Sequence, residues 1–412
     1  MHVVYERCCG LDVHKTSVVA CLLLTERDGR VRKDVRTFGT MTADLLALAD
    51  WLLAAGCTHV AMESTGVYWR PIWNLLEGSF TLLLVNARHI KAVPGRKTDV
   101  RDSEWIADLL QHGLLRPSFV PPRPHRELRE LTRYRTSLLR ERAAEVNRLQ
   151  KTLEGANIKL ASVATDITGK SGRQIMAALV EGTTEAATLA GLAQGRLREK
   201  LPRLEQALTG RMGAHQRFLL AQQLAHIESL ETIIERVSAE IAERLSPCAE
   251  AIARLTTIPG VGRRTAEVLV AEIGTDMSQF PTAAHLASWA GLCPGNHESA
   301  GKRKSGRTRK GNPWLRTALV EVAQAAGRAK QTYLGAQYQR LVSRRGKKKA
   351  TVAVAHTILV IAYYILRRQT TYEDLGSCYF DERDRKAVEH RLVHRLEGLG
   401  YKVILEPVTP AA

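Results

Sequence analysis

The chain has 412 residues, 45% of them hydrophobic, so it can bury more than one core, and we expect two or three domains. Its 60 lysines and arginines outnumber its 42 acidic residues, and the formal net charge of +18 predicts a polyanionic partner, nucleic acid first and an anionic membrane second. Seven scattered cysteines without a CxxC pair argue against a disulfide framework or a zinc site, and they predict reduced thiols in a cytoplasmic protein.

The first part of the chain, Arg7 to Gly113, has an α/β pattern. Two β-rich runs are broken near His14–Lys15, and the turn "RDGR" leads into a third strand, "VRKDVRTF". A helical pattern ends at Gly56, after which the strands "THVAMES" and "FTLLLVN" alternate with the helices "GVYWRPIWNLLEG" and "VRDSEWIADLLQHG". Strands joined as hairpins and then alternating with helices predict a mixed sheet with helices on its faces.

A proline-rich linker is predicted from Leu114 to Arg126, followed by two long helical patterns. The first carries one apolar stripe, and in the second, "LAHIESLETIIERVSAEIAERL", apolar residues recur in alternating steps of three and four. This heptad spacing predicts a coiled coil or helical arm that forms a dimer or tetramer. The alternative is a pair of helices packed within one subunit. The small-residue-rich segment 161–215 between them gives no functional prediction.

A third, mostly helical unit follows, so we expect domains at 1–114, 125–248 and 249–370 and a tail at 371–412. Its apolar run from Ala350 to Leu366 is slightly short for a membrane span and contains His356, which predicts a buried helix. The N-terminus lacks the basic-then-apolar order of a signal peptide. No membrane partner is therefore expected.

Four acidic residues stand out by position. Asp12 lies in the first strand and Glu63 ends the strand "HVAME", whereas Asp99 and Asp102 stand three apart at the start of a helix. Asp is depleted in strands and costly to bury unpaired, so Asp12 is more typical of a functional residue than of a structural one. Glu63 fits a solvated strand end equally well. Asp99 and Asp102, taken alone, favour a helix cap and its first turn.

These acids can nevertheless converge, because sites in open sheets gather at strand ends and at the adjoining helix starts. Carboxylate oxygens suit Mg²⁺ or Mn²⁺. Two such ions, about 3.5–4 Å apart, can stabilise both the attacking and the leaving oxygens of a phosphoryl transfer. Bound metal would also offset the repulsion between Asp99 and Asp102.

The motifs "GLDVHK", "MESTGVYW" and "KTDVRDSEWIADLL", in this order, resemble the DEDD transposases of the IS-one-ten insertion-sequence family. The resemblance implies an N-terminal domain similar to a Holliday-junction resolvase of the RNase H-like superfamily, with Asp12, Glu63, Asp99 and Asp102 as catalytic metal ligands. It also implies donor and target DNA as partners, together with a structured non-coding bridge RNA that pairs with both.

"LTTIPGVGRRTAEVLVAEIG" reads as a helix, a turn and a helix. Gly260 and Gly262 permit a tight turn whose N–H groups can face a phosphate at the start of the next helix. The pattern resembles a helix-hairpin-helix, which grips the DNA backbone without reading its sequence. An ordinary turn between helices is the alternative, but the adjacent Arg263 and Arg264 favour DNA binding.

A dense basic loop lies between Gly295 and Pro313, and we expect it to be flexible and to close around phosphates. Its cations are Lys302, Arg303, Lys304, Arg307, Arg309 and Lys310. A disordered segment is the alternative, but the apolar helices on both sides argue that the loop is anchored. Ser299 lies in this loop, where a serine is usually only polar surface. "ESAGK" and "RKGNPWLR" resemble the family's C-terminal transposase domain, which implies that Ser299 attacks DNA and forms a covalent phosphoserine link.

We interpret the chain as a prokaryotic, cytoplasmic and nucleoid-associated DNA transposase or recombinase. It would combine an α/β RNase H-like (Holliday-junction-resolvase-like) domain, a central helical coiled-coil arm and a mostly α-helical C-terminal domain with a helix-hairpin-helix. The resemblance implies a composite site, in which the serine of one subunit meets the metal cluster of another. The alternatives are a junction-selective, metal-dependent endonuclease without a serine intermediate and a non-enzymatic nucleic-acid-binding protein.

Overall fold

The computed structural model describes residues 2–64, 66–86, 102–295, 297–299 and 301–405. The chain divides into two compact units, Met1–Pro122 and Arg123–Ala412. Each unit has its own hydrophobic core, and the two are described separately below.

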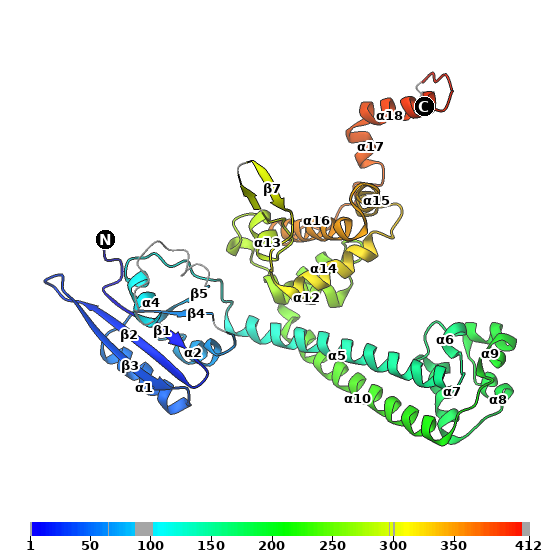
Figure 1. Ribbon diagram of the computed structural model, residues 1–412, viewed down its shortest axis with the longest axis horizontal. Coiled ribbons are helices and arrows are strands. Elements are labelled where there is room, and N and C mark those ends of the chain that lie inside the picture. Colours follow the sequence, from blue (N-terminus) through cyan, green and yellow to red (C-terminus); the bar gives the residue numbers. More distant parts are fainter. Residues whose placement is uncertain (1, 65, 87–101, 296, 300, 406–412) are drawn as a thin grey trace. The chain divides into compact units, whose positions relative to one another are not determined.

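The first unit is built on a five-stranded mixed sheet with the strand order β3-β2-β1-β4-β5 (Figure 1). The pairs β1–β2 and β2–β3 are antiparallel, whereas β1–β4 and β4–β5 are parallel. The strands are β1 (Arg7–Val13), β2 (Ser17–Thr25), β3 (Val31–Gly39), β4 (His59–Glu63) and β5 (Thr81–Val85). The predicted mixed sheet is confirmed, and it is compatible with an RNase H-like domain.

Helices cover both faces of this sheet. Apolar side chains of α1 (Thr42–Ala54) and α2 (Trp69–Leu76) share one core with Cys9, Leu11 and Val13 of β1. Helix α4 (Asp102–Gln111) packs on the other face, where its side chains share a second core with Cys8. Because side chains alternate along a strand, Gly10 and Asp12 belong to the same face as Cys8.

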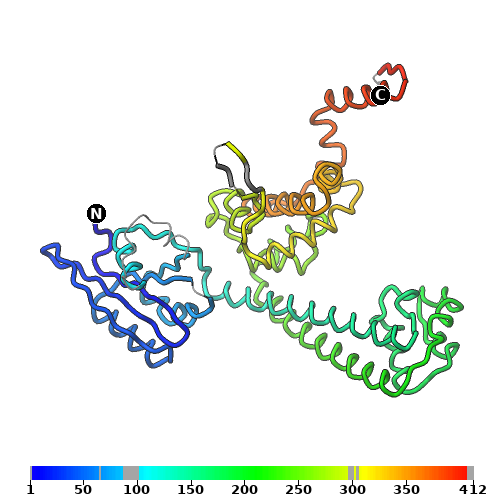
Figure 2. The backbone as a smooth tube through the Cα atoms, viewed as in Figure 1, coloured from blue at the N-terminus to red at the C-terminus, as the bar shows by residue number. Residues whose placement is uncertain are grey.

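The second unit begins with two antiparallel helices, α5 (Arg123–Gly155) and α10 (Ala214–Arg244), whose course can be followed in Figure 2. Their apolar stripes meet at Leu138, Leu230 and Ile234. Two ion pairs, Arg142–Glu231 at 2.7 Å and Arg244–Glu127 at 3.1 Å, fix the antiparallel register. The structure thus buries the heptad stripe within one chain, which is the alternative to the self-association that the spacing predicted.

Helix α5 begins at Arg123, three residues before the end of the predicted linker at Arg126. Its first turn contains Pro124, which is tolerated there because the first N–H groups of a helix have no partner within the helix. The proline-rich composition therefore marks the approach to α5 as well as its first turn.

The segment between α5 and α10 forms a small helical cap with its own core. Ile175, Met176 and Leu204 pack there with Leu149 of α5 and Leu220 of α10. The elements of the cap are α6 (Leu160–Val163), α7 (Lys170–Glu181), α8 (Ala186–Gly191), the 3₁₀ helix η1 (Gly195–Lys200) and α9 (Leu201–Leu208).

A helical body follows, and we use this name for the part from Ser246 to Arg368. Its elements are η2 (Ser246–Cys248), α11 (Ala249–Thr256), α12 (Arg263–Ile273), η3 (Met277–Gln279), α13 (Ala283–Trp289), α14 (Pro313–Ala326), α15 (Tyr333–Arg345) and α16 (Lys347–Arg368). The predicted tail contains α17 (Tyr379–Arg383) and α18 (Arg385–Glu397).

Helix α16 is the one helix in the described part of the chain that is long and apolar enough to cross a membrane. Its side chains at Val354, Ile358 and Leu359 are fully buried in the core of the helical body. The apolar composition of α16 is therefore explained by its packing, as the sequence predicted.

Candidate functional site

The carboxyl ends of β1 and β4 bring two of the predicted acids to neighbouring positions. These strands are parallel, and Leu11 pairs with Met62, so Asp12 and Glu63 come next in the two strands. Leu11 and Met62 point into the core under α1 and α2, which places Asp12 and Glu63 on the opposite face of the sheet. Both residues are half-buried.

Helix α4 brings a third predicted acid towards the same end of the sheet. It runs antiparallel to β1, because Gln111 O accepts from Val4 N at 2.8 Å, whereas Ala107 O accepts from the Cys8 thiol at 3.8 Å. The first residue of α4, Asp102, therefore lies towards the carboxyl end of β1, where Asp12 is.

Gly10 makes the close approach of α4 to β1 possible. A Cβ atom at Gly10 would lie 2.4 Å from both Ala107 N and Ser103 O, which is far inside van der Waals contact. The sequence analysis did not single out this residue. The sequence does contain an indication of its role, because a glycine inside an apolar strand often marks a place where another backbone comes close.

His14 is a second residue that the sequence analysis used only as a turn marker. Its Nε2 lies 3.1 Å from Oδ2 of Asp12, and the side chains of His14 and Asp12 are 58% and 24% exposed. An ion pair, Lys33–Glu104 at 2.8 Å, connects β3 with α4 on the same face. An imidazole and a lysine ammonium thus lie among the acidic side chains of this face.

Asp99 lies outside the described residues. Among the residues that the structure describes, no group of three or more His, Cys, Asp and Glu side chains is close enough to hold a metal ion. Asp12, Glu63 and Asp102 share one face and one end of the sheet, and their convergence with Asp99 on a metal stays a prediction.

The basic segment that was predicted to be a flexible loop forms a two-stranded hairpin, β6 (His297–Ser299) and β7 (Lys302–Ser305). Ser299 pairs with Lys302 across the turn. Gly301 adopts φ +71°, a left-handed conformation that permits so tight a turn and so allows the flanking residues to pair. Ser299 is therefore the last residue of β6, although the side chains of 297–299 and 303–305 lie outside the described part.

Four cations of the basic segment have described side chains, and all of them are exposed to solvent: Lys302, Arg307, Arg309 and Lys310. Exposed positive charges of this kind are available to a phosphate backbone at the protein surface.

The base of the hairpin is closed by two glycines. A Cβ at Gly311 would lie 2.4 Å from Gly291 N, so the two chain segments cross in direct backbone contact. Next to this crossing, Gly295 N donates to Arg307 O at 2.9 Å. The hairpin consequently leaves the helical body and returns to it at one place.

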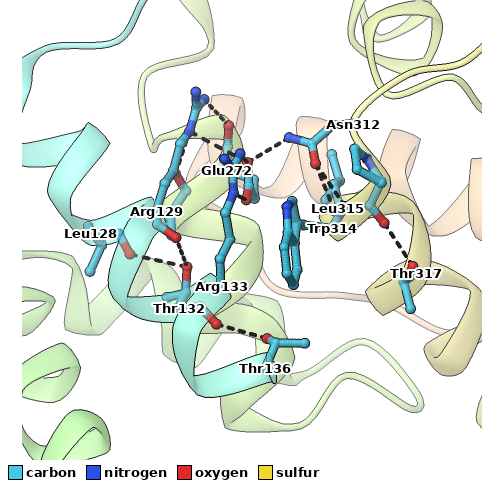
Figure 3. A network of polar contacts seen from close by, with 12 residues as sticks. Leu128, Arg129, Thr132, Arg133, Thr136, Glu272, Asn312, Trp314, Leu315 and Thr317 are labelled. Carbon is cyan, nitrogen blue, oxygen red and sulfur yellow. Dashed lines mark hydrogen bonds and ion pairs between the residues drawn. The ribbon is translucent and has the colours of Figure 1, made fainter. Parts of the chain in front are cut away.

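A buried carboxylate joins this base to α5 and α12 (Figure 3). Glu272 of α12 is fully buried and accepts hydrogen bonds from Arg133 at 2.7 and 2.8 Å and from the Asn312 amide at 2.6 Å. The Asn312 oxygen in turn caps α14 by accepting from Trp314 N and Leu315 N. Burial lowers the pKa of the nearby Arg129 to about 10, with Glu272 opposing the shift.

The predicted helix, turn and helix are present as α11, the turn and α12. Gly260 has φ +87°, and a Cβ there would lie 3.0 Å from Val322 O of α14, so packing as well as conformation requires glycine. Gly262 precedes α12, and the exposed Arg263 and Arg264 form its first turn. Arg263 also pairs with Glu267 at 3.1 Å. The role of this turn in gripping DNA stays a prediction.

Comparison with known protein families gives two matches. Residues 9–158, which include the four acids, match a family model described as a transposase. Residues 252–339, which include Ser299, match a second model, described as the transposase of the IS116/IS110/IS902 family. The matched regions are thus those that carry the predicted site residues.

Several individual proteins are similar over most of the chain. A probable family 20 transposase of Pseudomonas aeruginosa is 29% identical over 320 residues, which cover 76% of this chain and 85% of the relative. A transposase for insertion sequence element IS1111A of Coxiella burnetii is 27% identical, covering 78% of this chain and 80% of the relative. An uncharacterized 44.8 kDa protein of insertion element IS116 of Streptomyces clavuligerus is 31% identical, covering 60% and 68%.

Proposed function

The chain belongs to the IS116/IS110/IS902 family of insertion-sequence transposases, and on this premise we propose that it recombines DNA with a metal-bound acid cluster and a serine nucleophile. The observation that carries the proposal is the register of β1 and β4. This register puts Asp12 and Glu63 side by side, on the face that α4 covers and at the end of the sheet where α4 begins with Asp102.

The donor set fits a hard divalent cation. Asp12, Glu63, Asp99 and Asp102 would supply only carboxylate oxygens, which are the ligands that Mg²⁺ and Mn²⁺ prefer. A cation bound there would stabilise the negative charge that develops on a phosphate during transfer. His14, 3.1 Å from Asp12, would orient that carboxylate through its ring N–H.

Ser299 would be the nucleophile. Its Oγ would attack the phosphorus of one DNA strand and give up its proton to water. The P–O bond to one deoxyribose would break, and the leaving oxygen would take a proton from water and become a hydroxyl. One P–O bond forms as another breaks, so the phosphoserine link conserves the bond for rejoining. The position of Ser299 beside the hairpin turn would let a strand reach it.

The positive charges would hold the DNA. The exposed cations of the hairpin and the first turn of α12 at Gly262 can contact phosphates without reading bases. We further propose that the serine of one subunit acts with the acid cluster of another, and that a structured bridge RNA selects donor and target. The net charge of +18 supports a nucleic-acid partner of either kind.

The test is incubation of the full chain with DNA of the element ends and Mg²⁺, with and without transcripts of the flanking sequence. We expect a covalent protein–DNA adduct that Ser299→Ala abolishes and that Ser305→Ala, a matched control in the same hairpin, retains. Complete strand exchange by the Ser299→Ala variant would overturn the serine assignment. Cleavage by the parent chain without any adduct would instead indicate an endonuclease.

The acids need a separate variant. We expect Asp12→Asn to bind DNA but to lose metal-dependent cleavage, whereas Asp50→Asn, an exposed acid of α1, keeps it. The loss should exceed the about 10- to 100-fold effect that is typical of residues behind the ligands. If Asp12→Asn retains every activity, the chain would be a binding protein and not an enzyme.

A further inference from the structure

A cavity of about 380 Å³ lies between α5, α12 and α14. Its size is within the range of about 300–1,000 Å³ that is typical of small-ligand sites. Glu272 and Arg133, which belong to the network at the base of the hairpin, form part of its lining. The cavity therefore adjoins the anchored end of the basic hairpin.

The lining of this cavity combines an aromatic ring with small apolar and hydroxyl side chains. Trp314 of α14 contributes the indole, beside Ala318 and Thr317 of the same helix. The Arg140 guanidinium of α5 lies 5.4 Å from the centre of the Trp314 ring. Flat aromatic surfaces next to guanidinium groups are the surfaces on which unpaired bases stack.

The charges of the cavity divide into two groups. Arg133 is committed to Glu272 at 2.7 Å, and Arg135 to Glu267 at 2.7 Å. Arg140 and Arg264 have no ion pair within the part of the chain that the structure describes, and both are exposed. One further carboxylate, Glu321, lines the cavity. The charges of Arg140, Arg264 and Glu321 together are therefore net positive.

We propose that this cavity takes one unpaired nucleotide of a single-stranded nucleic-acid segment, with its base against Trp314 and its flanking phosphates at Arg140 and Arg264. The proposal rests on the proposed function only in that the chain acts on nucleic acid. It adds that strand separation is recognised in the helical body, next to the base of the hairpin that carries Ser299. A nucleic-acid strand bound by the hairpin would therefore pass close to this cavity, which adjoins the base of the hairpin.

The test measures equilibrium binding by the full chain in EDTA, so that no cleavage step contributes. The probes are a short labelled oligothymidylate, an abasic strand of the same length, an oligouridylate and a DNA duplex. We expect the oligothymidylate to bind about 10- to 100-fold more tightly than the abasic strand, because base–aromatic stacking has that magnitude. The uridylate probe decides whether the nucleotide comes from DNA alone or also from RNA.

Trp314→Leu should remove this preference for bases and leave the salt dependence of binding unchanged. Arg140→Gln and Arg264→Gln should instead weaken binding of both strands and lower the slope of log K against log salt by about 0.7 each. Arg236→Gln removes an exposed charge from α10, away from the cavity, and should leave the ratio between the two strands unchanged.

A second variant guards against a folding defect in Trp314→Leu. Ala318→Phe keeps the indole but fills the cavity, and it should also abolish the preference for bases. An equal affinity of the parent chain for thymidylate and abasic strands would overturn the proposal, as would an unchanged ratio in both variants. Neither result would affect the serine adduct assay, so the two proposals fail separately.

Discussion

The amide nitrogen of Asn312 lies 2.6 Å from Oε2 of the fully buried Glu272, while the amide oxygen of Asn312 caps α14. One side chain therefore starts a helix, ends the basic hairpin and completes the hydrogen bonds of a buried carboxylate. Because Glu272 also binds Arg133, the base of the hairpin is tied to α5 through two side-chain contacts.

Substitution at this contact tests whether the two residues act as a pair. Asn312→Asp keeps a good helix cap but brings two carboxylates together, and Glu272→Gln leaves Arg133 without its counter-charge. We expect each single variant to lower the free energy of unfolding by about 3–5 kcal/mol, the usual result of breaking a buried pair. The double variant should recover much of this loss, because a Gln amide can donate to the new Asp. Urea unfolding measures all three.

The control for this pair is Glu250→Gln, whose partner is Arg254 and whose side chain is 85% exposed. It should change stability little, because exposed ion pairs contribute little. Additive losses in the double variant would show that Asn312 and Glu272 are not coupled.

Gly10→Ala tests the close packing of α4 on β1. The new methyl group would meet the backbone of α4 at 2.4 Å, so the helix must shift. We expect a loss of about 1–3 kcal/mol in unfolding free energy, as in other overpacked cores. DNA cleavage should fall as well, since Asp102 moves with α4. Gly155→Ala, where a Cβ meets nothing within 4 Å, is the matched control and should be neutral or stabilising.

Acid should weaken the pairing of α5 with α10. Burial acts to raise the pKa of Glu231, but hydrogen bonds and charge from Arg142 and Arg173 prevail and hold it below the ordinary 4.5. A carboxylate with a lowered pKa stabilises the folded state fully above its ordinary pKa, and this contribution is lost as the pH falls through the lower value. Glu231→Gln should cost about 1.5–3 kcal/mol at neutral pH, as expected for hydrogen bonds to charged groups.

The measurement is unfolding free energy against pH for the parent chain and this variant. The difference between them should shrink as the pH falls below 4.5. Glu235→Gln, an exposed glutamate of the same helix, should show no such trend. A difference that stays constant down to pH 3 would contradict the assignment.

Cysteine alkylation should report the unfolding of the first unit. Burial raises the pKa of Cys8, Cys21 and Cys57 to about 12, and that of Cys9 well above its ordinary value. These thiols therefore carry almost no thiolate near pH 8 and should react slowly. Cys378 is exposed and should be labelled first. Peptide mass spectrometry across a urea series checks this order, and rapid labelling of Cys9 in native buffer would contradict it.

Local patterns were enough to predict the elements of the first unit. The apolar periodicity of a strand or helix and the turn residues that end it lie within a few positions of each other. The elements β1, β2, β3 and α1 could therefore be placed from sequence. The register of Leu11 with Met62 could not, because it depends on contacts between segments far apart in the chain. The same limit hid the meaning of Gly10, which is explained only by the backbone of α4.

In the second unit, prediction from sequence failed for a different reason. A heptad stripe indicates that a helix needs an apolar partner, but it does not say whether that partner is in the same chain. The hairpin was missed because six cations dominate its composition, whereas pairing of Ser299 with Lys302 depends on the conformation of Gly301. The bond between Glu272 and Asn312 joins residues 40 positions apart and has no local signature.

Because Gly291 and Gly311 cross in direct backbone contact, the length of the hairpin does not affect how the helices at its base pack. Both segments pass through one point, so pairs of residues inserted or deleted at the tip would change its reach by about 3.3 Å each without moving α13 or α14. The hairpin can thus be shortened or lengthened while its base stays fixed, so the distance between Ser299 and the helical body can vary without a change in the fold of that body.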